Sequence, residues 1–457
     1  RQTQVRRSRS ADIVLPEVAR LGELSGARDL LTKKQLKQAW QAVTAAIQLR
    51  PFHPEAWTML AEIAREARHA GIAKDCASKA RAMAPGYHHA RKVEKSLRKS
   101  REAEPQPWMQ IPASADRLSV IMIAKNEAGF IGDCLQSVKD VADQIIGVET
   151  GSTDETVEIA KGHGAELHHM RWGDDFSAAR NESLAHARGS WILFIDADEE
   201  LMPEGIEELQ SAMARSDTLA WRIPIVDAGR EHLGKNHVPR LFRNAPGLFF
   251  KGRIHEQVSL SIESRRIQWG LQHRMGGPTL FHRGYQDEVV KSRNKRARNI
   301  RLLDRALEES PNDANLLMNL GMELASMGRG EAALEQYRDA FTVFQLAGKE
   351  LQAPELREAL VTQFATHFLG HGQNKSALSI LNSPVASASA LTATQEFLVG
   401  LAHLRLSKHK TAADAFRKSL KKRHLSSLTP ASEQVVNGGV DHCLAICLAK
   451  MEDEGAE

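Results

Sequence analysis

Apolar residues change their spacing twice along this 457-residue chain. Between about residues 20 and 100, and again beyond about 310, apolar and small residues recur at the spacing of amphipathic helices. Between these segments, short apolar runs at 118–124, 144–149, 165–170 and 191–196 alternate with helix-like sequence. Such alternation is typical of a mostly parallel sheet covered by helices on both faces. The pattern therefore predicts an α/β domain flanked by all-α segments.

The helical segments contain an internal repeat. Pro51 and Pro85 lie 34 residues apart, and the small residues of this unit return at the same offsets around Gly321 and, more loosely, around Gly400. This period and these offsets are those of tetratricopeptide units, in which a helical hairpin has small residues where its two helices touch. Stacked hairpins form concave surfaces suited to a protein partner or an extended peptide. Unrelated amphipathic helices remain the alternative for 345–392.

These patterns divide the chain into five segments. The expected segments are a basic tail at 1–19, tetratricopeptide-like repeats at 20–100, a Pro-rich polar linker at 101–117, the α/β domain at 118–290 and further tetratricopeptide-like repeats at 291–457.

Composition narrows the class of protein. With 42% hydrophobic and 26% charged residues, a net charge of +4 and no long apolar run, the chain reads as a soluble protein without a membrane span, a signal peptide or a nucleic-acid partner. The four scattered cysteines predict neither disulfides nor zinc, which fits a cytoplasmic setting. Two basic clusters, at 1–10 and 291–301, are either solvated surface or contacts with phosphates or the inner face of an anionic membrane.

Carboxylates gather where the predicted strands end. The ligand site of an open parallel sheet lies at these ends, and Glu127, Asp154 and the pair Asp196 and Asp198 all fall there. On an extended strand the last two would point to the same side. Two carboxylates so close repel unless a cation or a donor lies between them, and Mg²⁺ or Mn²⁺ prefers such oxygen ligands. Glu199 and Glu200, by contrast, are expected to begin a helix.

The loop at 151–154 allows two interpretations. Ser152 or Thr153 caps the helix that follows, or the loop presents backbone N–H groups to a ligand. The two roles are compatible.

Four ordered segments carry a family resemblance. The segments VIMIAKNE, GVETGSTDETVEIA, FSAARNESLAHARGSWILFIDADEEL and RLFRNAPGLFFKGRIHEQV, which lie within roughly 116–290, resemble inverting family 2 glycosyltransferases of GT-A fold. The most similar branch contains lipopolysaccharide core β-1,4-glucosyltransferases, some of which have tetratricopeptide units. The resemblance implies a GT-A domain, Rossmann-like in its binding of a nucleotide sugar, that acts in the synthesis of a cell-envelope polysaccharide.

The resemblance also implies roles for residues. The first two strand-end loops would hold the nucleoside of a UDP-sugar, Asp196 would face the ribose, and Asp198 would bind the metal. Arg180 and Asn181 would lie on a helix beside the nucleotide. The expected donor-binding residues are Ala124, Asn126, Glu127, Glu149, Ser152, Asp154, Arg180, Asn181, Asp196 and Arg240. Glu149 departs from the family, which usually has Asp at this position.

Chemistry on the acceptor side needs a base. An inverting transfer removes a proton from the acceptor hydroxyl, and Glu256 is the candidate, with His255 beside it. The competing interpretation is a structural Glu256 paired with Arg253 or Arg240. His282 is a candidate third metal ligand, with His255 as the alternative. Arg240 either contacts the diphosphate or anchors its strand.

Three functions follow from these residues. The first is metal-dependent transfer of a hexose, most simply glucose, from a UDP-sugar to a hydroxyl of a glycolipid or polysaccharide. The second is a tetratricopeptide scaffold with a weakly active or inactive nucleotide-sugar domain. The third is transfer to a peptide or protein: a groove lined by Asn and apolar side chains would favour a peptide acceptor, whereas the basic cluster at 291–301 would suit an anionic lipid.

Overall fold

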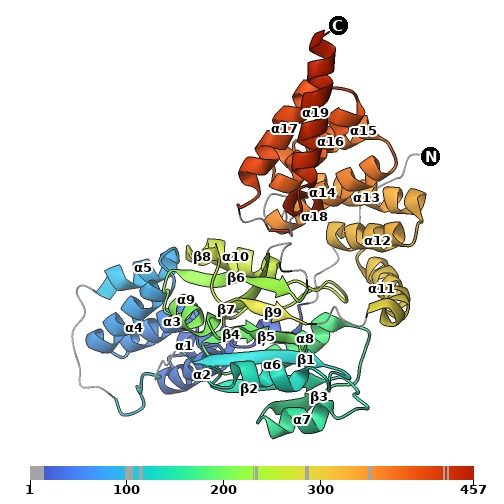
Figure 1. The fold of residues 1–457 in the computed structure, drawn as a ribbon. Helices are drawn as coiled ribbons and strands as arrows, with labels where there is room; N and C mark the ends of the chain where they lie inside the picture. The colour runs from blue at the N-terminus through green and yellow to red at the C-terminus, as the bar shows by residue number, and fades with distance from the viewer. Residues whose placement is uncertain are drawn as a thin grey trace.

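The computed structural model describes residues 15–97, 106–112, 117–229, 231, 235–283, 288–347, 353–425, 428–429 and 432–456, and their side chains except those of 288–295 and 453–456. The N-terminal helices cover one end of a central sheet, and a larger group of helices rises from another side of it (Figure 1). The tail at 1–14 and the linker residues 101–105 and 113–116 lie outside the described residues.

Helical hairpins form the N-terminal part. The helices are η1 (Glu17–Arg20), α1 (Ser25–Thr32), α2 (Leu36–Leu49), α3 (Pro54–Glu66), α4 (Ala70–Met83) and α5 (His88–Ser96). Pro54 begins α3, where a missing N–H costs nothing. Ala61 and Ala77 are fully buried in the core shared by these helices, as small residues must be where two helices approach closely. Within the predicted linker, Trp108 packs edge-on against Trp40 at 6.0 Å, so this part of it is anchored.

The central domain is built on a mixed sheet. Its strands are β1 (Leu118–Ala124), β2 (Gln144–Glu149), β3 (Glu166–His169), β4 (Trp191–Phe194), β5 (Glu199–Leu201), β6 (Thr218–Asp227), β7 (Asn236–Arg243), β8 (Gln272–Met275) and β9 (Leu280–His282). They follow the order β3-β2-β1-β4-β7-β6-β9-β5, with β8 on β6. Strands β1 to β4 are parallel, but β7 is antiparallel to β4 and to β6. Strand β6 also pairs parallel with β8 and β9, so the expected mostly parallel sheet is correct apart from the antiparallel pairs that β7 and β5 make.

Helices cover both faces of this sheet. They are α6 (Ile131–Val138), α7 (Thr156–Gly162), α8 (Phe176–Ala185), α9 (Gly205–Met213) and α10 (Ser259–Trp269). Strand residues alternate between two cores: Trp191 and Leu193 lie in one, and Ile192 and Phe194 in the other. This alternation follows from the two-residue period of a strand and explains why β4 is apolar at every position.

The prediction of a helix at Glu199 is wrong. Residues 199–201 form β5, which pairs antiparallel with β9, and the helix begins only at Gly205. Glu199 is 2% exposed and forms an ion pair with Arg240, so it is a core residue rather than a helix-starting acid. A run of acids in a sequence favours a helix start. Here Glu199 lies in a strand instead, where its charge has a partner that is distant in the sequence.

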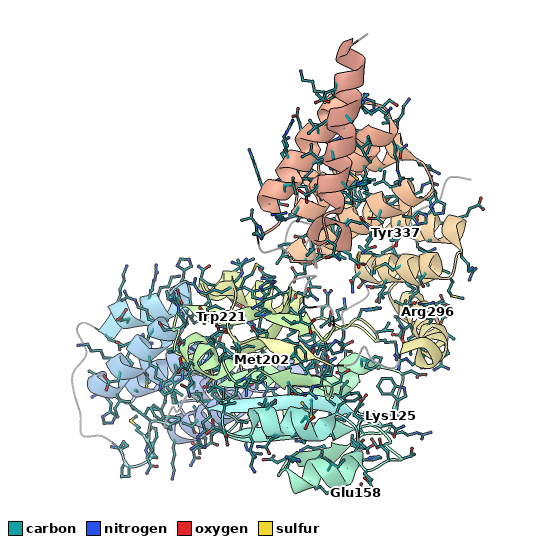
Figure 2. The ribbon with its side chains drawn as sticks, in the orientation of Figure 1. Lys125, Glu158, Met202, Trp221, Arg296 and Tyr337 are labelled. Atoms are coloured by element: carbon teal, nitrogen blue, oxygen red, sulfur yellow. The ribbon has the colours of Figure 1, made fainter. Side chains whose placement is uncertain are left out.

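A C-terminal array of helices follows the sheet. It comprises α11 (Glu288–Glu309), α12 (Ala314–Ser326), α13 (Gly330–Leu346), α14 (Pro354–Gly370), α15 (Asn374–Leu381), η5 (Ala386–Ala388), α16 (Ala393–Arg405), α17 (His409–Lys422), α18 (Glu433–Val436) and α19 (Gly439–Ala456). Tyr337 lies inside it (Figure 2), and its ring touches Gly321, where an added Cβ would lie 3.1 Å away. Gly400 meets Phe416 in the same way. The helices therefore pair where the repeat pattern predicts contact.

The array is attached to the sheet domain by ion pairs. Arg222 of β6 contacts Glu355 of α14 at 3.1 Å, and Arg253 contacts Glu309 of α11 at 2.5 Å. In the described part of the basic cluster at 291–301, Arg301 lies 3.4 Å from Asp174, and its side chain is 67% exposed. No described helix is long and apolar enough to cross a membrane.

Candidate functional site

The loops after β1 and β2 are joined by side-chain hydrogen bonds. Ala124 and Glu149 are paired in register at the ends of these strands. Asn126, with a left-handed φ of 57°, accepts a bond from the Thr153 N–H through Oδ1 at 2.8 Å and donates its own N–H to Ser152 Oγ at 3.2 Å. Ser152 thus faces the neighbouring loop, and Asp154 instead accepts from the first N–H of α7, at Thr156. The two loops form one preorganised unit.

Two further contacts complete this unit. The Glu127 N–H donates to Thr156 Oγ1 at 2.8 Å, and the Ala128 N–H donates to Asp154 Oδ2 at 3.2 Å. Asp154 therefore bridges the start of α7 and the loop after β1. The predicted donor-binding residues of both loops lie together at one edge of the sheet.

Glu149 organises its own turn. One carboxylate oxygen accepts the N–H groups of Gly151, at 2.5 Å, and of Ser152; the other lies 2.6 Å from His169 Nδ1. Burial would raise the pKa of Glu149, but these bonds outweigh it and hold the pKa below its ordinary value. Sequence analysis assigned no role to His169, although it ends β3 directly beside Glu149 in the parallel register.

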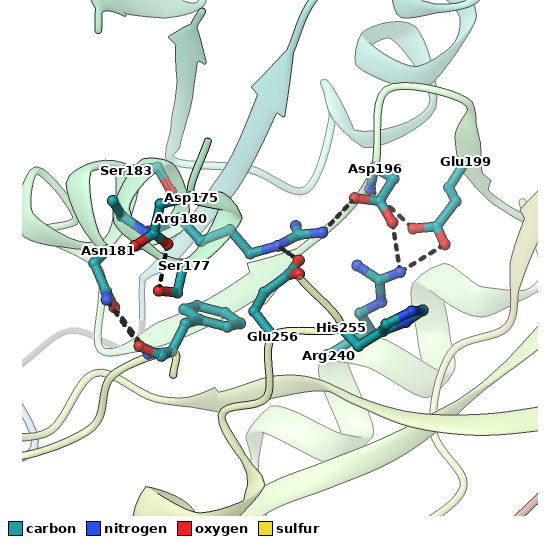
Figure 3. A network of polar contacts seen from close by, with 12 residues as sticks. Asp175, Ser177, Arg180, Asn181, Ser183, Asp196, Glu199, Arg240, His255 and Glu256 are labelled. Atoms are coloured by element: carbon teal, nitrogen blue, oxygen red, sulfur yellow. Dashed lines mark hydrogen bonds and ion pairs between the residues drawn. The ribbon is translucent and has the colours of Figure 1, made fainter. Parts of the chain in front are cut away.

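A five-residue charge network lies where β4 ends. Asp196 accepts from Arg180 at 3.1 Å and from Arg240 at 2.7 Å, through different oxygens. Arg240 also contacts Glu199 at 2.9 Å, and Arg180 donates to Glu256. Figure 3 shows Arg180 and Arg240 both contacting Asp196. The guanidinium groups stack on the Phe194 ring, at 3.7 Å and 4.0 Å from its centroid.

The network shifts the pKa values of Asp196 and Glu199 in opposite directions. Burial would raise the pKa of Asp196, but the charges of Arg240 and Arg180 hold it well below the usual range. For Glu199 burial dominates, and with the nearby Asp196 charge it raises the pKa to about 7 despite Arg240. Such separation of neighbouring carboxyl pKa values is frequent at functional sites. Asp196 is thus a permanent anion that fixes both arginines.

Glu256 belongs to the same network. Its partner is Arg180, because Arg253 pairs with Glu309 and Arg240 with Asp196 and Glu199. The sequence analysis offered a structural Glu256 paired with Arg253 or Arg240 as the competing interpretation. Both of these predicted partners are wrong. Glu256 uses Oε1 for this contact, and its side chain is 10% exposed.

The neighbours of Glu256 differ in their surroundings. His255 is exposed and has a left-handed φ of 54°. Asn181 is buried: its Nδ2 donates to the Phe250 carbonyl and its Oδ1 accepts the Phe250 N–H, both at 2.8 Å. These two bonds attach α8 to the loop that leads to Glu256.

Asp198 and His282 face each other. His282 Nε2 lies 3.2 Å from Asp198 Oδ2, and its Nδ1 lies 2.8 Å from Asp227 Oδ1. Residues 197–198 form a turn, so Asp196 and Asp198 are not two positions of one extended strand and their side chains contact different groups. The hydrogen bond with Asp198, and then that with Asp227, raise the pKa of His282 to about 9.

This donor set fits a divalent cation. Neighbouring ligands of an octahedral Mg²⁺ with bonds of about 2.1 Å lie about 3.0 Å apart, close to the observed separation of 3.2 Å. Asp227 on the far nitrogen is the carboxylate that commonly orients a metal-binding imidazole, and sequence analysis missed it. Within the described residues no group of three His, Cys, Asp or Glu side chains could hold a metal. Further ligands would have to come from the substrate or water.

Comparison with known proteins identifies the domain. Residues 119–289 match the model of Glycosyl transferase family 2. A TPR repeat-containing protein of Synechococcus elongatus is 36% identical over 228 residues, which are 49% of this chain and 56% of that protein. The glycosyltransferase SunS of Bacillus subtilis is 27% identical over 228 residues, 49% of this chain and 53% of its own. The chain thus spans about half the length of these curated relatives.

Solved structures show remote similarity. Staphylococcus aureus TarS, crystallised with UDP-GlcNAc, matches with a TM-score of 0.33 and 12% identity over 66% of this chain and 92% of its own. Glucosyl-3-phosphoglycerate synthase of Mycobacterium tuberculosis, with Mn²⁺ and UDP-glucose, matches with a TM-score of 0.32 and 18% identity over 42% of this chain and 79% of its own.

The family match covers Asp196, Asp198, Glu256 and His282. It confirms the resemblance inferred from the motifs. The chain therefore contains a glycosyl transferase family 2 domain, set between two groups of helical hairpins.

Proposed function

We propose that the chain is an inverting glycosyltransferase that moves glucose from UDP-glucose to an acceptor hydroxyl with Mg²⁺ or Mn²⁺. The observation that supports this most directly is the convergence of three features at one edge of the sheet. These are the loops around Asn126 and Glu149, the facing pair Asp198 and His282, and Glu256 joined through Arg180 to Asp196.

Each feature would do one task. The two loops would bind the nucleoside, with Ala124, Asn126, Glu127, Glu149, Ser152 and Asp154 as its contacts. Arg180 and Arg240, fixed by Asp196, would hold positive charge close to the leaving diphosphate. Asp198 and His282 would hold the metal, which when bound neutralises charge on the diphosphate. Glu256 would accept the acceptor proton through its second oxygen.

The decisive experiment is UDP-glucose hydrolysis with Mn²⁺, in which water replaces the acceptor. Asp198→Asn keeps the size of the side chain but removes its charge, and we expect hydrolysis to fall by about 100-fold or more. Asp414→Asn, at a side chain 57% exposed on α17, is the matched control and should retain activity. Equal activity in the two variants would contradict the proposal.

The donor is tested separately. Thermal unfolding is measured with UDP-, GDP- and dTDP-sugars, each with Mn²⁺, because a ligand that binds the folded state raises the melting temperature. We expect the largest shift with UDP-glucose. A shift seen only with GDP-sugars would show that the nucleotide assignment is wrong.

One observation favours the second candidate, a scaffold without activity. Both oxygens of Asp196 already have arginine partners, so the network is closed without a substrate. A scaffold would bind UDP without hydrolysing UDP-glucose, and Asp198→Asn would change nothing but metal affinity.

A further inference from the structure

A cavity of about 400 Å³ lies between the sheet domain and the C-terminal array. Phe194, Phe250 and Glu256 line it from the sheet domain, and Asn315, Met318 and Leu356 line it from α12 and α14. Pockets that take small ligands have volumes of about 300–1,000 Å³. The space is therefore large enough for part of a substrate, and neither domain encloses it alone.

The cavity opens on the proposed site. Glu256 is part of its wall and is bonded to Arg180, which in turn contacts Asp196. Phe194, another wall residue, is the ring on which Arg180 and Arg240 stack. A group bound in the cavity would therefore lie against the candidate base.

The array holds the loop that carries Glu256. Ile254 is 4% exposed and packs in the hydrophobic core of the C-terminal array, together with Leu302 and Leu316. Arg253, the residue before Ile254, pairs with Glu309. The buried pair of Arg222 and Glu355 fixes α14 beside the same cavity. Acceptor-side chemistry in this chain thus depends on the helical array as well as on the sheet.

The described lining offers no permanent cation to an anionic acceptor. Among the described residues that form the wall, none is Lys or Arg, and the two carboxylates, Glu256 and Glu355, each contact an arginine outside it. The remaining surface is apolar or carries carboxamides such as those of Gln257 and Asn315, together with the hydroxyls of Ser259 and Thr429 and the imidazoles of His237 and His255. A carboxamide both donates and accepts, as a peptide group does, whereas a phosphorylated acceptor would find no Lys or Arg in the described wall to pair with.

We propose that this cavity is the acceptor site and that the acceptor is an uncharged peptide segment bearing a hydroxyl; this inference rests on the proposed function. Carboxamides of the wall bond the peptide groups, and Met318 and Leu356 contact apolar side chains. In the transfer the hydroxyl proton passes to Glu256 and the hydroxyl oxygen bonds the anomeric carbon. The bond from that carbon to the phosphate oxygen breaks, and its electron pair leaves with UDP.

The test compares transfer to two probes with hydrolysis. One probe is a pool of capped heptapeptides with a central Ser among Ala, Leu, Asn and Gly; the other is glycerol phosphate. With UDP-glucose and Mn²⁺, we expect the full chain to glucosylate the peptide pool and not glycerol phosphate. Transfer to glycerol phosphate alone, or to neither probe while UDP-glucose is hydrolysed, overturns the inference. Absence of both hydrolysis and UDP binding overturns the proposed function instead.

Variants then locate the site. Met318→Trp fills the cavity from α12, and Ala359→Leu, a smaller change, fills it from α14. We expect each to lower the ratio of peptide transfer to hydrolysis by about tenfold, with UDP still raising the melting temperature. Met322→Trp, one turn along α12 at a side chain 36% exposed, is the matched control and should leave the ratio unchanged. An unchanged ratio in both cavity variants overturns the inference.

Discussion

Arg240 is the residue whose removal tests the charge network most directly. Its side chain is 8% exposed and lies between Asp196 Oδ2 at 2.7 Å and Glu199 Oε1 at 2.9 Å. In Arg240→Met an unbranched side chain still packs on Phe194, but the positive charge is lost. Glu199 then loses its cation, and Asp196 keeps only Arg180.

The expected cost follows from burial. Removing one partner of a buried ion pair costs about 3–5 kcal/mol, because the other partner stays desolvated. If Glu199 is the main source of this cost, the double variant Arg240→Met with Glu199→Gln recovers about 1–3 kcal/mol, the usual coupling of residues in one network. The Asp196 charge, still paired with Arg180, accounts for the remainder.

Urea denaturation followed by circular dichroism and tryptophan fluorescence measures both values. Arg215→Met is the control, since Arg215 and Asp217 form a surface pair with side chains 52% and 48% exposed, and such pairs contribute less than about 1 kcal/mol. A cost for Arg240→Met no larger than that of the control would refute the reasoning. So would full additivity of the Arg240 and Glu199 changes.

Three further predictions concern other parts of the molecule. The pKa of Glu263 is lowered to about 2, because its bonds with His273 and Arg266 outweigh burial. The ionised side chain therefore stabilises the fold above the unfolded pKa near 4.5, and this stabilisation is lost as pH falls toward 2. Urea unfolding should therefore show the advantage of wild type over Glu263→Gln shrinking by about 2 kcal/mol between pH 5 and pH 3; a constant difference would contradict the shift. Gly400→Ala would place a Cβ 2.4 Å from the Phe416 ring, so thermal unfolding should reveal a loss of about 1–3 kcal/mol, whereas Gly26→Ala meets nothing within 4 Å and serves as control. Glu149→Asp is one methylene too short to reach both its turn and His169; we expect a loss of about 1 kcal/mol in thermal stability, and the same loss again in the His169→Gln background would show that the contact contributes nothing.

Much of the fold could be predicted from local pattern. The strands at 118–124 and 144–149 have the expected bounds, because strands buried on both faces are continuous apolar runs that end where polar loop residues begin. The hairpins around Gly321 and Gly400 follow from small residues at a fixed period, because only a small residue lets two helices approach closely. The grouping of Glu127, Asp154, Asp196 and Asp198 at strand ends likewise follows from the geometry of a parallel sheet.

The contacts within the site could not be predicted in this way. Glu199 looked like a helix start, and only the position of Arg240, 41 residues later, makes it a buried strand residue. Asp227, 55 residues before His282, and His169, 20 residues after Glu149, meet their partners through strand pairing. A sequence pattern reports a residue's neighbours along the chain, whereas these pairs depend on which strands lie side by side.

By itself, the sequence determined the α/β domain, the helical repeats around it, the family of that domain and most of the residues at its strand ends. Only the tertiary structure decided the partner of each charge, the antiparallel pairs of β7 and β5 and the cavity that the C-terminal array closes beside Glu256. Local periodicity specifies secondary structure because helices and strands differ in the spacing of their buried and exposed side chains, and this spacing can be read along the chain. Burial of a charge requires a partner, and that partner comes from wherever the packed chain brings one.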